Sequence, residues 1–306
     1  MTLPEVAGFY DMVREPLTRV RRGLAAKTTY DRPWPLLPLM ICEAISGHYE
    51  YALPAAASLQ LLTAAADVFD DIEDADSSES LPARYGSGVA TNVATTLLML
   101  AERAITRLKG RGVADDIILR VIDAVNSFYT TACAGQHLDL SLTPETTVSE
   151  DRYLTVAYMK SASTVECTCH VAALLATANR GLIDIFTKFG NNLGMASQIA
   201  NDIHGITHES EIFKRKMTIP VIYALAQTDS EIRNYLESVF RNQSEVVPDT
   251  RQIRDLLFRT GAIHYATVKM EFYRQRALDN LSEAEVAGAN MERLKLFLGI
   301  SPTRSI

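Results

Sequence analysis

The sequence predicts an all-α protein, and three observations support this fold class. Residues with high helix propensity, among them Ala, Leu, Met and Glu, are abundant. Apolar residues recur at helical spacing, whereas the strict alternation typical of half-buried strands is scarce. Glycine and proline mark the breaks between amphipathic stretches. The predicted helices are 4–24, 35–47, 53–76, 89–108, 113–138, 149–179, 182–205, 217–227, 229–241, 248–282 and 288–299.

The breaks between these helices give no sign of a domain boundary. The clearest are Gly47-His48, Leu81-Pro82, Arg180-Gly181 and Val247-Pro248. No low-complexity linker and no internal repeat separates two halves of the 306 residues. We therefore expect residues 1–306 to form a single large helical domain.

Charge and hydropathy limit the partners that this chain is expected to have. Lys plus Arg number 30 and Asp plus Glu number 37, giving a formal net charge of −7. This balance argues against a nucleic-acid-binding protein. The first residues lack the basic start and apolar core of a signal peptide. No apolar run approaches the roughly 18 residues that span a bilayer, so we expect a cytoplasmic protein without a transmembrane segment.

An acidic cluster ends the apolar helix predicted at 53–76. At about 100° per residue, Asp67, Asp70, Asp71 and Asp74 share one face of this helix. Like charges at this spacing repel one another, which suggests a compensating cation, and carboxylate oxygens suit Mg²⁺. The alternative is a solvated acidic helix end, and this cluster alone leaves both interpretations open.

A second polar cluster follows the apolar helix predicted at 182–205. Gln198, Asn201, Asp202 and Glu209 fall on one helical face, and the last three of these residues offer oxygen ligands for another hard cation. The alternative is a helix C-terminus with Gly205 as the first residue beyond it. In that case Glu209 lies in a loop, and its reach to a metal is left open.

Cationic and amide side chains suited to a diphosphate occur elsewhere in the chain. Lys216 ends a run of three basic residues soon after the second cluster, and Lys160 lies within an otherwise apolar helix. A buried lysine is rare unless it is paired. Gln136 and Asp139 lie three residues apart near the end of the helix predicted at 113–138.

Together these motifs resemble the trans-prenyl synthase family, which has the class I isoprenoid synthase fold, a single large helical bundle. The resemblance covers about residues 30 to 280, and the motifs occur in the family's order. The first aspartate-rich motif matches Asp70, Asp71 and Asp74; the others match Gln136 with Asp139, Lys160, Gln198 with Asn201 and Asp202, and Lys216 with Thr218, Ile219 and Pro220.

The resemblance implies a magnesium-dependent enzyme that ionises an allylic prenyl diphosphate. Three Mg²⁺ ions would bridge the acidic residues and the diphosphate, which Lys160, Gln136, Gln198 and Lys216 would bind. It also implies a homodimer. The wall of the pocket for the prenyl tail would include Ala65, Ala66 and Phe69, and the small alanines would leave depth for a farnesyl or geranylgeranyl chain.

The sequence departs from chain-elongating members of this family at the site for isopentenyl diphosphate. Their dense cationic segment is reduced to Lys27 and Arg32. Thr63 replaces a histidine, and the arginine pair after the aspartate motif is absent. A diphosphate needs several cationic partners. We therefore expect an acceptor other than isopentenyl diphosphate.

Two subfamilies fit such a loss. One is the ComQ-type prenyltransferases, which modify a tryptophan of a peptide; the aspartate motif and the Asn-Asp-x-His-Gly run are similar to theirs, and Asp67 fits their pattern. The other is the class I terpene synthases, whose second metal motif has the spacing of Asn201, Asp202 and Glu209. An ordinary chain-elongating synthase and a catalytically degenerate helical partner subunit are the remaining alternatives.

Overall fold

The computed structural model describes residues 4–25, 34–74, 78–141, 148–209, 212, 214–227, 230–240 and 249–298. Within these ranges the regular structure is helical, as predicted, and includes no strand. The chain divides into two compact units. Unit 1 comprises Met1–Val125, Thr168–Ile183 and Ala284–Ile306, and unit 2 comprises Asn126–Cys167 and Asp184–Glu283. The single-domain organisation stays a prediction.

Unit 1 begins with α1 and holds the first acidic motif at the end of α3. Its helices and short 3₁₀ turns are α1 (Pro4–Ala25), η1 (Trp34–Leu36), α2 (Leu37–Ser46), η2 (Glu50–Ala52), α3 (Leu53–Asp74), α4 (Leu81–Tyr85), α5 (Ser87–Thr106), η3 (Lys109–Arg111) and α15 (Glu292–Phe297). Among the described helices, four others have residues in both units, namely α6 (Asp115–Leu140), α8 (Ser163–Ala176), α9 (Arg180–Thr207) and α14 (Ala262–Val286).

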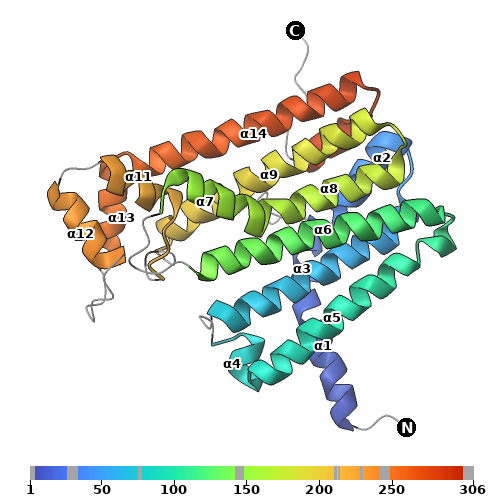
Figure 1. Cartoon of the computed structure of the whole chain (residues 1–306), viewed down its shortest axis with the longest axis horizontal. Coiled ribbons are helices and arrows are strands. Elements are labelled where there is room, and N and C mark those ends of the chain that lie inside the picture. Colours follow the sequence, from blue (N-terminus) through green and yellow to red (C-terminus); the bar gives the residue numbers. More distant parts are fainter. Residues whose placement is uncertain are drawn as a thin grey trace. The chain divides into compact units, whose positions relative to one another are not determined.

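The core of unit 1 forms where α3 lies along α5 (Figure 1). Ala64, Ala65 and Val68 of α3 are buried in one cluster with Ala90 and Val93 of α5. Small side chains on both helices let their backbones approach closely while the apolar surface leaves water. This packing fixes α3, and with it the direction in which the acidic face points within unit 1.

Helix α3 also corrects an expectation about hydropathy. Glu50–Glu73 is long and apolar enough, by length and composition, to cross a membrane, so the prediction that no run approaches this length is wrong. A core helix of a globular protein meets the same criteria. In this structure 56% of the apolar window is buried inside the protein, and Val68, near its end, packs into the cluster with α5.

Unit 2 contains α7 (Glu150–Ala157), the π-helical turn η4 (Tyr158–Ala162), α11 (Ile219–Gln227), α12 (Ser230–Phe240) and α13 (Thr250–Arg259). A buried cluster joins the last three of these helices, with Leu225, Leu236 and Ile253 at its centre. Ser149 caps α7 by accepting a hydrogen bond from the Arg152 amide, and Asp249 caps α13 in the same way. These caps satisfy amide groups that a helix start leaves without partners.

Two predicted helices are interrupted in ways that periodicity did not indicate. The segment predicted at 149–179 contains the π-turn η4 between α7 and α8. The segment predicted at 248–282 is broken at Gly261, whose φ of +78° is readily adopted only by glycine. The first interruption matters for the site, because η4 carries Lys160.

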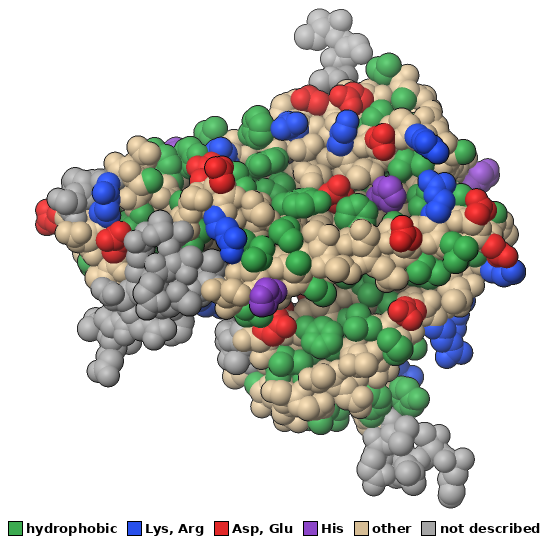
Figure 2. Space-filling view, viewed as in Figure 1, with side chains coloured by type: hydrophobic (Ala, Val, Ile, Leu, Met, Phe, Trp, Pro, Cys, Tyr) green, Lys and Arg blue, Asp and Glu red, His purple; other side chains and the backbone are tan. Residues whose placement is uncertain are grey.

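Basic and acidic side chains are interspersed on the face of the molecule shown in Figure 2. This mixed pattern means that the fields of opposite charges partly cancel over the described part of that face.

Candidate active site

The first acidic motif lies in the last turns of α3, as the sequence predicted. Asp70 and Asp71 are partly buried and Asp67 is exposed. The helix is regular here, so the carboxylates of these residues project over a shared arc of its surface. Asp74 is the last residue of α3, and its side chain lies outside the described part of the structure.

The carboxylates on α3 fit a metal ion whose coordination shell is completed by ligands other than protein side chains. Among the described residues, no group of three or more His, Cys, Asp or Glu side chains is arranged to hold a metal ion. Mg²⁺ is usually bound through one or two carboxylates, with water and substrate phosphate oxygens completing its octahedron. Asp70 and Asp71 therefore fit an ion that binds together with a diphosphate better than one held by protein groups alone.

The residues predicted to line the tail pocket lie on different sides of α3. Ala65 is fully buried in the cluster that α3 forms with α5. Phe69 is partly buried and packs against the same cluster. Ala66, in contrast, is exposed and lies one helical turn before Asp70. Of the two alanines, only Ala66 has an open side on which a substrate chain could lie.

Among the predicted carboxylates whose side chains the structure describes, Asp202 is the most enclosed. Its side chain is buried in unit 2, with only 6% exposed. Oδ2 accepts a hydrogen bond of 2.6 Å from the Tyr153 hydroxyl, and Oδ1 accepts one of 2.9 Å from Gln198 Nε2. Each carboxylate oxygen can accept more than one bond, so Asp202 is oriented and still able to bind a cation. Asn201 is exposed beside it.

Sequence reasoning found Gln198 but missed Tyr153. Gln198 and Asp202 lie four residues apart on α9, a spacing that places them on one face of a helix. Tyr153 lies on α7, and its bond to Asp202 joins residues 49 positions apart. The only sequence signal at Tyr153 is helical periodicity, which does not reveal the partner of a side chain.

Lys160 forms an ion pair with Asp139 in unit 2. Lys160 Nζ lies 2.7 Å from Asp139 Oδ2, and the two side chains are 23% and 32% exposed. Gln136 is partly buried one turn before Asp139 on α6. A half-buried ion pair is stronger than a fully solvated one because water screens it less. The structure thus brings together two residues that the sequence placed in separate motifs.

The basic run near Lys216 precedes α11. Lys216 is partly buried, and Arg215 has a φ of +55°, which is unusual for a residue other than glycine. Thr218 is 4% exposed, and its hydroxyl has no hydrogen-bond partner among the described residues. An unsatisfied buried hydroxyl costs free energy, so this loop offers a polar atom that a bound anion or water would satisfy.

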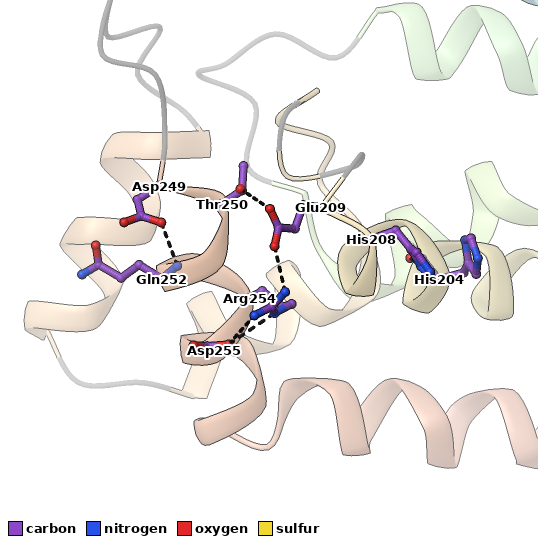
Figure 3. A network of polar contacts seen from close by, with 8 residues as sticks. All are labelled: His204, His208, Glu209, Asp249, Thr250, Gln252, Arg254 and Asp255. Carbon is purple, nitrogen blue, oxygen red and sulfur yellow. Dashed lines mark hydrogen bonds and ion pairs between the residues drawn. The ribbon is translucent and has the colours of Figure 1, made fainter.

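Glu209 is bound by residues of α13 (Figure 3). Its Oε1 lies 2.7 Å from Arg254 Nη1, and its other oxygen accepts a hydrogen bond from the Thr250 hydroxyl. Helix α9 continues through Gly205 and ends at Thr207, so the interpretation of Gly205 as the first residue beyond the helix is wrong. Glu209 lies in the following turn with a φ of +67°.

Another ion pair of unit 2 lies at the start of α7. Lys269 Nζ is 2.7 Å from Glu150 Oε1, and the Tyr265 hydroxyl donates to Glu150 Oε2 at 2.6 Å. Burial raises the pKa of Glu150, but the bonds from Lys269 and Tyr265 outweigh it and hold that pKa below its ordinary value. The bond to Glu150 raises the pKa of Lys269. Tyr153, the partner of Asp202, lies one turn further along α7.

A groove of about 450 Å³ lies in unit 1, but none of the predicted site residues lines it. Its walls come from η1, α2 and α15, and include Leu39, Met40 and Phe297. Tyr49 at its edge precedes the start of α3, whereas Asp70 lies near the other end of that helix, which is about 30 Å long at 1.5 Å per residue. The groove is therefore separate from the acidic motif.

Comparisons with known proteins place this geometry in a family. The polyprenyl synthetase family model matches residues 32–257. The chain is 26% identical over 280 residues to a geranylgeranyl diphosphate synthase of Sulfolobus acidocaldarius, covering 86% of this chain and 84% of the relative. It is 24% identical over 248 residues to the tryptophan prenyltransferase ComQ of Bacillus spizizenii, covering 79% and 85%.

Solved structures show the same fold. A geranylgeranyl pyrophosphate synthetase from Pyrococcus horikoshii superposes with a TM-score of 0.77 at 22% identity, covering 97% of this chain and 96% of that one. A polyprenyl synthetase from Streptomyces coelicolor superposes with a TM-score of 0.77 at 20% identity, covering 87% and 82%. Both likenesses confirm the predicted all-α class I isoprenoid synthase fold. From the match over 32–257, the chain belongs to the polyprenyl synthetase family of prenyltransferases.

Proposed function

We propose that this prenyltransferase ionises a farnesyl or geranylgeranyl diphosphate and transfers the prenyl group to an acceptor other than isopentenyl diphosphate. The observation that carries the proposal is the half-buried Lys160, held 2.7 Å from Asp139. A cation kept in place by a carboxylate is suited to bind the leaving diphosphate as negative charge develops on it. Gln136, Gln198 and Lys216 would add further donors to this anion.

The acidic residues have a complementary role in the proposal. Asp70, Asp71 and Asp74 on α3, together with Asn201 and Asp202 on α9, would hold the Mg²⁺ ions. The family generally uses Mg²⁺; when bound, such ions neutralise the diphosphate and make it a better leaving group. The number of ions, which the family resemblance sets at three, remains part of the proposal. Asp67 would extend the acidic face.

The proposed loss of the isopentenyl diphosphate site has support at Thr63. This residue is exposed on α3 one turn before Asp67, and its hydroxyl donates to the Leu59 carbonyl at 3.0 Å. A hydroxyl committed to its own helix is a poor substitute for a cationic partner of a diphosphate. The cationic segment near Lys27 and Arg32, and residues 75–77 after Asp74, lie outside the described residues.

An electron-rich aromatic ring, such as a peptide tryptophan, is the acceptor that we propose. It would attack the allylic carbon as the bond to the diphosphate breaks, and the ring would then lose a proton. The relatives do not indicate which acceptor is used, because they include both geranylgeranyl diphosphate synthases and tryptophan prenyltransferases. We further propose a cytoplasmic homodimer, from the family resemblance.

A radiolabelled donor assay tests the acceptor. Farnesyl or geranylgeranyl diphosphate is incubated with enzyme and Mg²⁺ alone, with isopentenyl diphosphate, or with a tryptophan-containing peptide encoded beside the gene. Label in the peptide is the expected result. Efficient elongation with isopentenyl diphosphate would overturn the proposed loss of that site, and the absence of diphosphate release under all three conditions would overturn the proposal of ionisation.

The second candidate function is a terpene synthase, in which the donor's own double bonds capture the cation. This function uses Glu209 as a metal ligand with Asn201 and Asp202. In the structure Glu209 binds Arg254 and Thr250 instead, which favours the transferase. A Glu209→Gln variant separates the two. If Glu209→Gln needs a higher Mg²⁺ concentration than the wild type, and if the wild type makes volatile product from donor alone, the protein is a terpene synthase.

A further inference from the structure

Two glycines of unit 2 touch the π-turn that carries Lys160. A Cβ atom built on Gly135 of α6 would lie 2.3 Å from the Lys160 amide nitrogen and 2.5 Å from the Met159 carbonyl carbon. A Cβ atom on Gly194 of α9 would lie 2.6 Å from the Cα atom of Ala162. All three distances are below any real Cβ contact, so only glycine allows these backbones to approach so closely.

The π-turn itself is held by hydroxyl groups. A π-turn inserts one residue into a helix and leaves carbonyl groups misaligned with the usual amide donors. Ser163 Oγ donates to the Met159 carbonyl at 2.7 Å, and Thr164 Oγ1 donates to the Ser161 carbonyl at 2.8 Å. The turn around Lys160 thus has side-chain donors for two of its carbonyl groups.

Gly135 and Asp139 act on the same lysine from the same helix. They are four residues apart on α6 and so lie on one face, one turn apart. Gly135 contacts the Lys160 backbone, and Asp139 binds its Nζ atom at 2.7 Å. A displacement of the backbone away from α6 would therefore change where the ammonium group lies relative to Asp139.

We propose that Gly135 and Gly194 are positioning residues for Lys160. Because neither glycine has a side chain, α6 and α9 contact the π-turn directly. This contact fixes the backbone of Lys160 at the position from which Nζ reaches Asp139 and the bound diphosphate. The inference rests on the proposed role of Lys160 in diphosphate binding. Two residues that have no functional group would thus determine where the lysine cation lies.

The test is a double-mutant cycle on donor affinity. Binding of farnesyl S-thiolodiphosphate, an analogue that ionises poorly, is measured by titration calorimetry with Mg²⁺ for wild type, Lys160→Ala, Gly135→Ala and the double variant. Each single variant should bind about tenfold to a hundredfold more weakly, the equivalent of one charge-assisted hydrogen bond. The double variant should bind no more weakly than Lys160→Ala, because Gly135 acts only through that lysine.

Gly88→Ala is the matched control. Gly88 is also helical, in α5, but a Cβ atom there meets nothing within 4 Å, so affinity and melting temperature should not fall. Should Gly135→Ala fail to fold by circular dichroism, Gly194→Ala takes its place in the cycle. Wild-type affinity in Gly135→Ala, additive losses in the double variant, or failure of both glycine variants to fold would overturn the positioning role. A wild type that binds no analogue would instead overturn the proposed function.

Discussion

Asp70 of unit 1 and Asp202 of unit 2 are both proposed magnesium ligands near the ends of long helices, but the protein holds them differently. Asp70 lies on a regular helix among other carboxylates and is partly exposed. Asp202 is buried, and both of its oxygens accept hydrogen bonds from Tyr153 and Gln198. Asp70 thus shares a partly exposed helical face with other carboxylates, whereas the carboxylate of Asp202 is enclosed and hydrogen-bonded to two neighbouring side chains.

This difference predicts which substitutions change activity alone and which change both activity and stability. Removing a partly exposed carboxylate from a row of like charges relieves repulsion, so the cost to the fold should be small. Removing a hydrogen-bonded buried carboxylate leaves its donors unpaired, at a cost of about 1–3 kcal/mol.

Asp70→Ala should abolish most of the activity and leave the fold intact. We expect diphosphate release to fall by more than about a hundredfold, since loss of a metal ligand should exceed the effect of losing a residue that merely supports one. Asp74→Ala should behave alike. Helical content and melting temperature should be unchanged. Glu73→Ala, on the same turn but outside the arc of Asp70 and Asp71, is the control. Wild-type release by Asp70→Ala would contradict the central claim.

Tyr153→Phe should affect both properties, each moderately. The variant removes one bond to Asp202 and keeps the ring, so we expect kcat/KM to fall about tenfold to a hundredfold and stability to fall by about 1 kcal/mol. Steady-state kinetics and urea unfolding measure the two effects. If stability falls while kcat/KM and the Mg²⁺ dependence stay at wild-type values, the hydrogen bond from Tyr153 to Asp202 has only a structural role.

Neighbouring alanines of α3 should respond in opposite ways to a phenylalanine. Ala66 is exposed, so Ala66→Phe should keep the fold and shift donor preference from farnesyl towards geranyl diphosphate. Ala65 is fully buried against α5, so Ala65→Phe should overpack the core and cost about 1–3 kcal/mol or more. Competition between two labelled donors and thermal melts measure these results. An unchanged preference in Ala66→Phe would show that another residue limits the tail.

The ion pair at the start of α7 should give a small, pH-dependent effect. The pKa of Glu150 is lower in the folded protein, so its contribution is present above the unfolded pKa of about 4.5 and is lost as the pH falls through the folded value. Glu150→Gln should therefore weaken the fold by less than about 1 kcal/mol near neutral pH and reduce the loss of stability in acid.

Thermal melts between about pH 3 and pH 7 measure this effect. Glu102→Gln, which changes an exposed residue of α5, is the control for the general effect of removing one carboxylate. If both variants show the same acid dependence as the wild type, Glu150 does not contribute through its charge.

The parts of the fold and site that depend on local repetition could be predicted from the sequence. Helical spacing gave the acidic face of α3 and the pairing of Gln198 with Asp202, because neighbours four residues apart meet in any regular helix. The family resemblance matched Lys160 and Asp139 to two separate motifs, and the structure places their charged groups 2.7 Å apart. The long apolar stretches likewise gave most helix positions to within a few residues.

The remaining features depend on contacts between distant segments, which a single sequence does not record. The bond from Tyr153 to Asp202 and the pair of Glu150 with Lys269 join helices far apart in the chain. Spacing also grouped Glu209 with Asn201 and Asp202, although a turn with positive φ brings Glu209 to Arg254. No sequence pattern indicates the π-turn, because the turn depends on contacts with residues of other helices, such as Gly135.

Because the π-turn contains one extra residue, a mutation that shortens this segment by one residue can remove the turn. Deleting one residue from Tyr158–Ala162 would restore a regular helix and rotate α7 by about 100° against the residues that follow, with a shift of about 1.5 Å. Tyr153 would then turn away from Asp202, while every side chain of the segment but one is retained. A lineage could thus lose or regain an oriented carboxylate through a single codon, without replacing any of the residues that define the site.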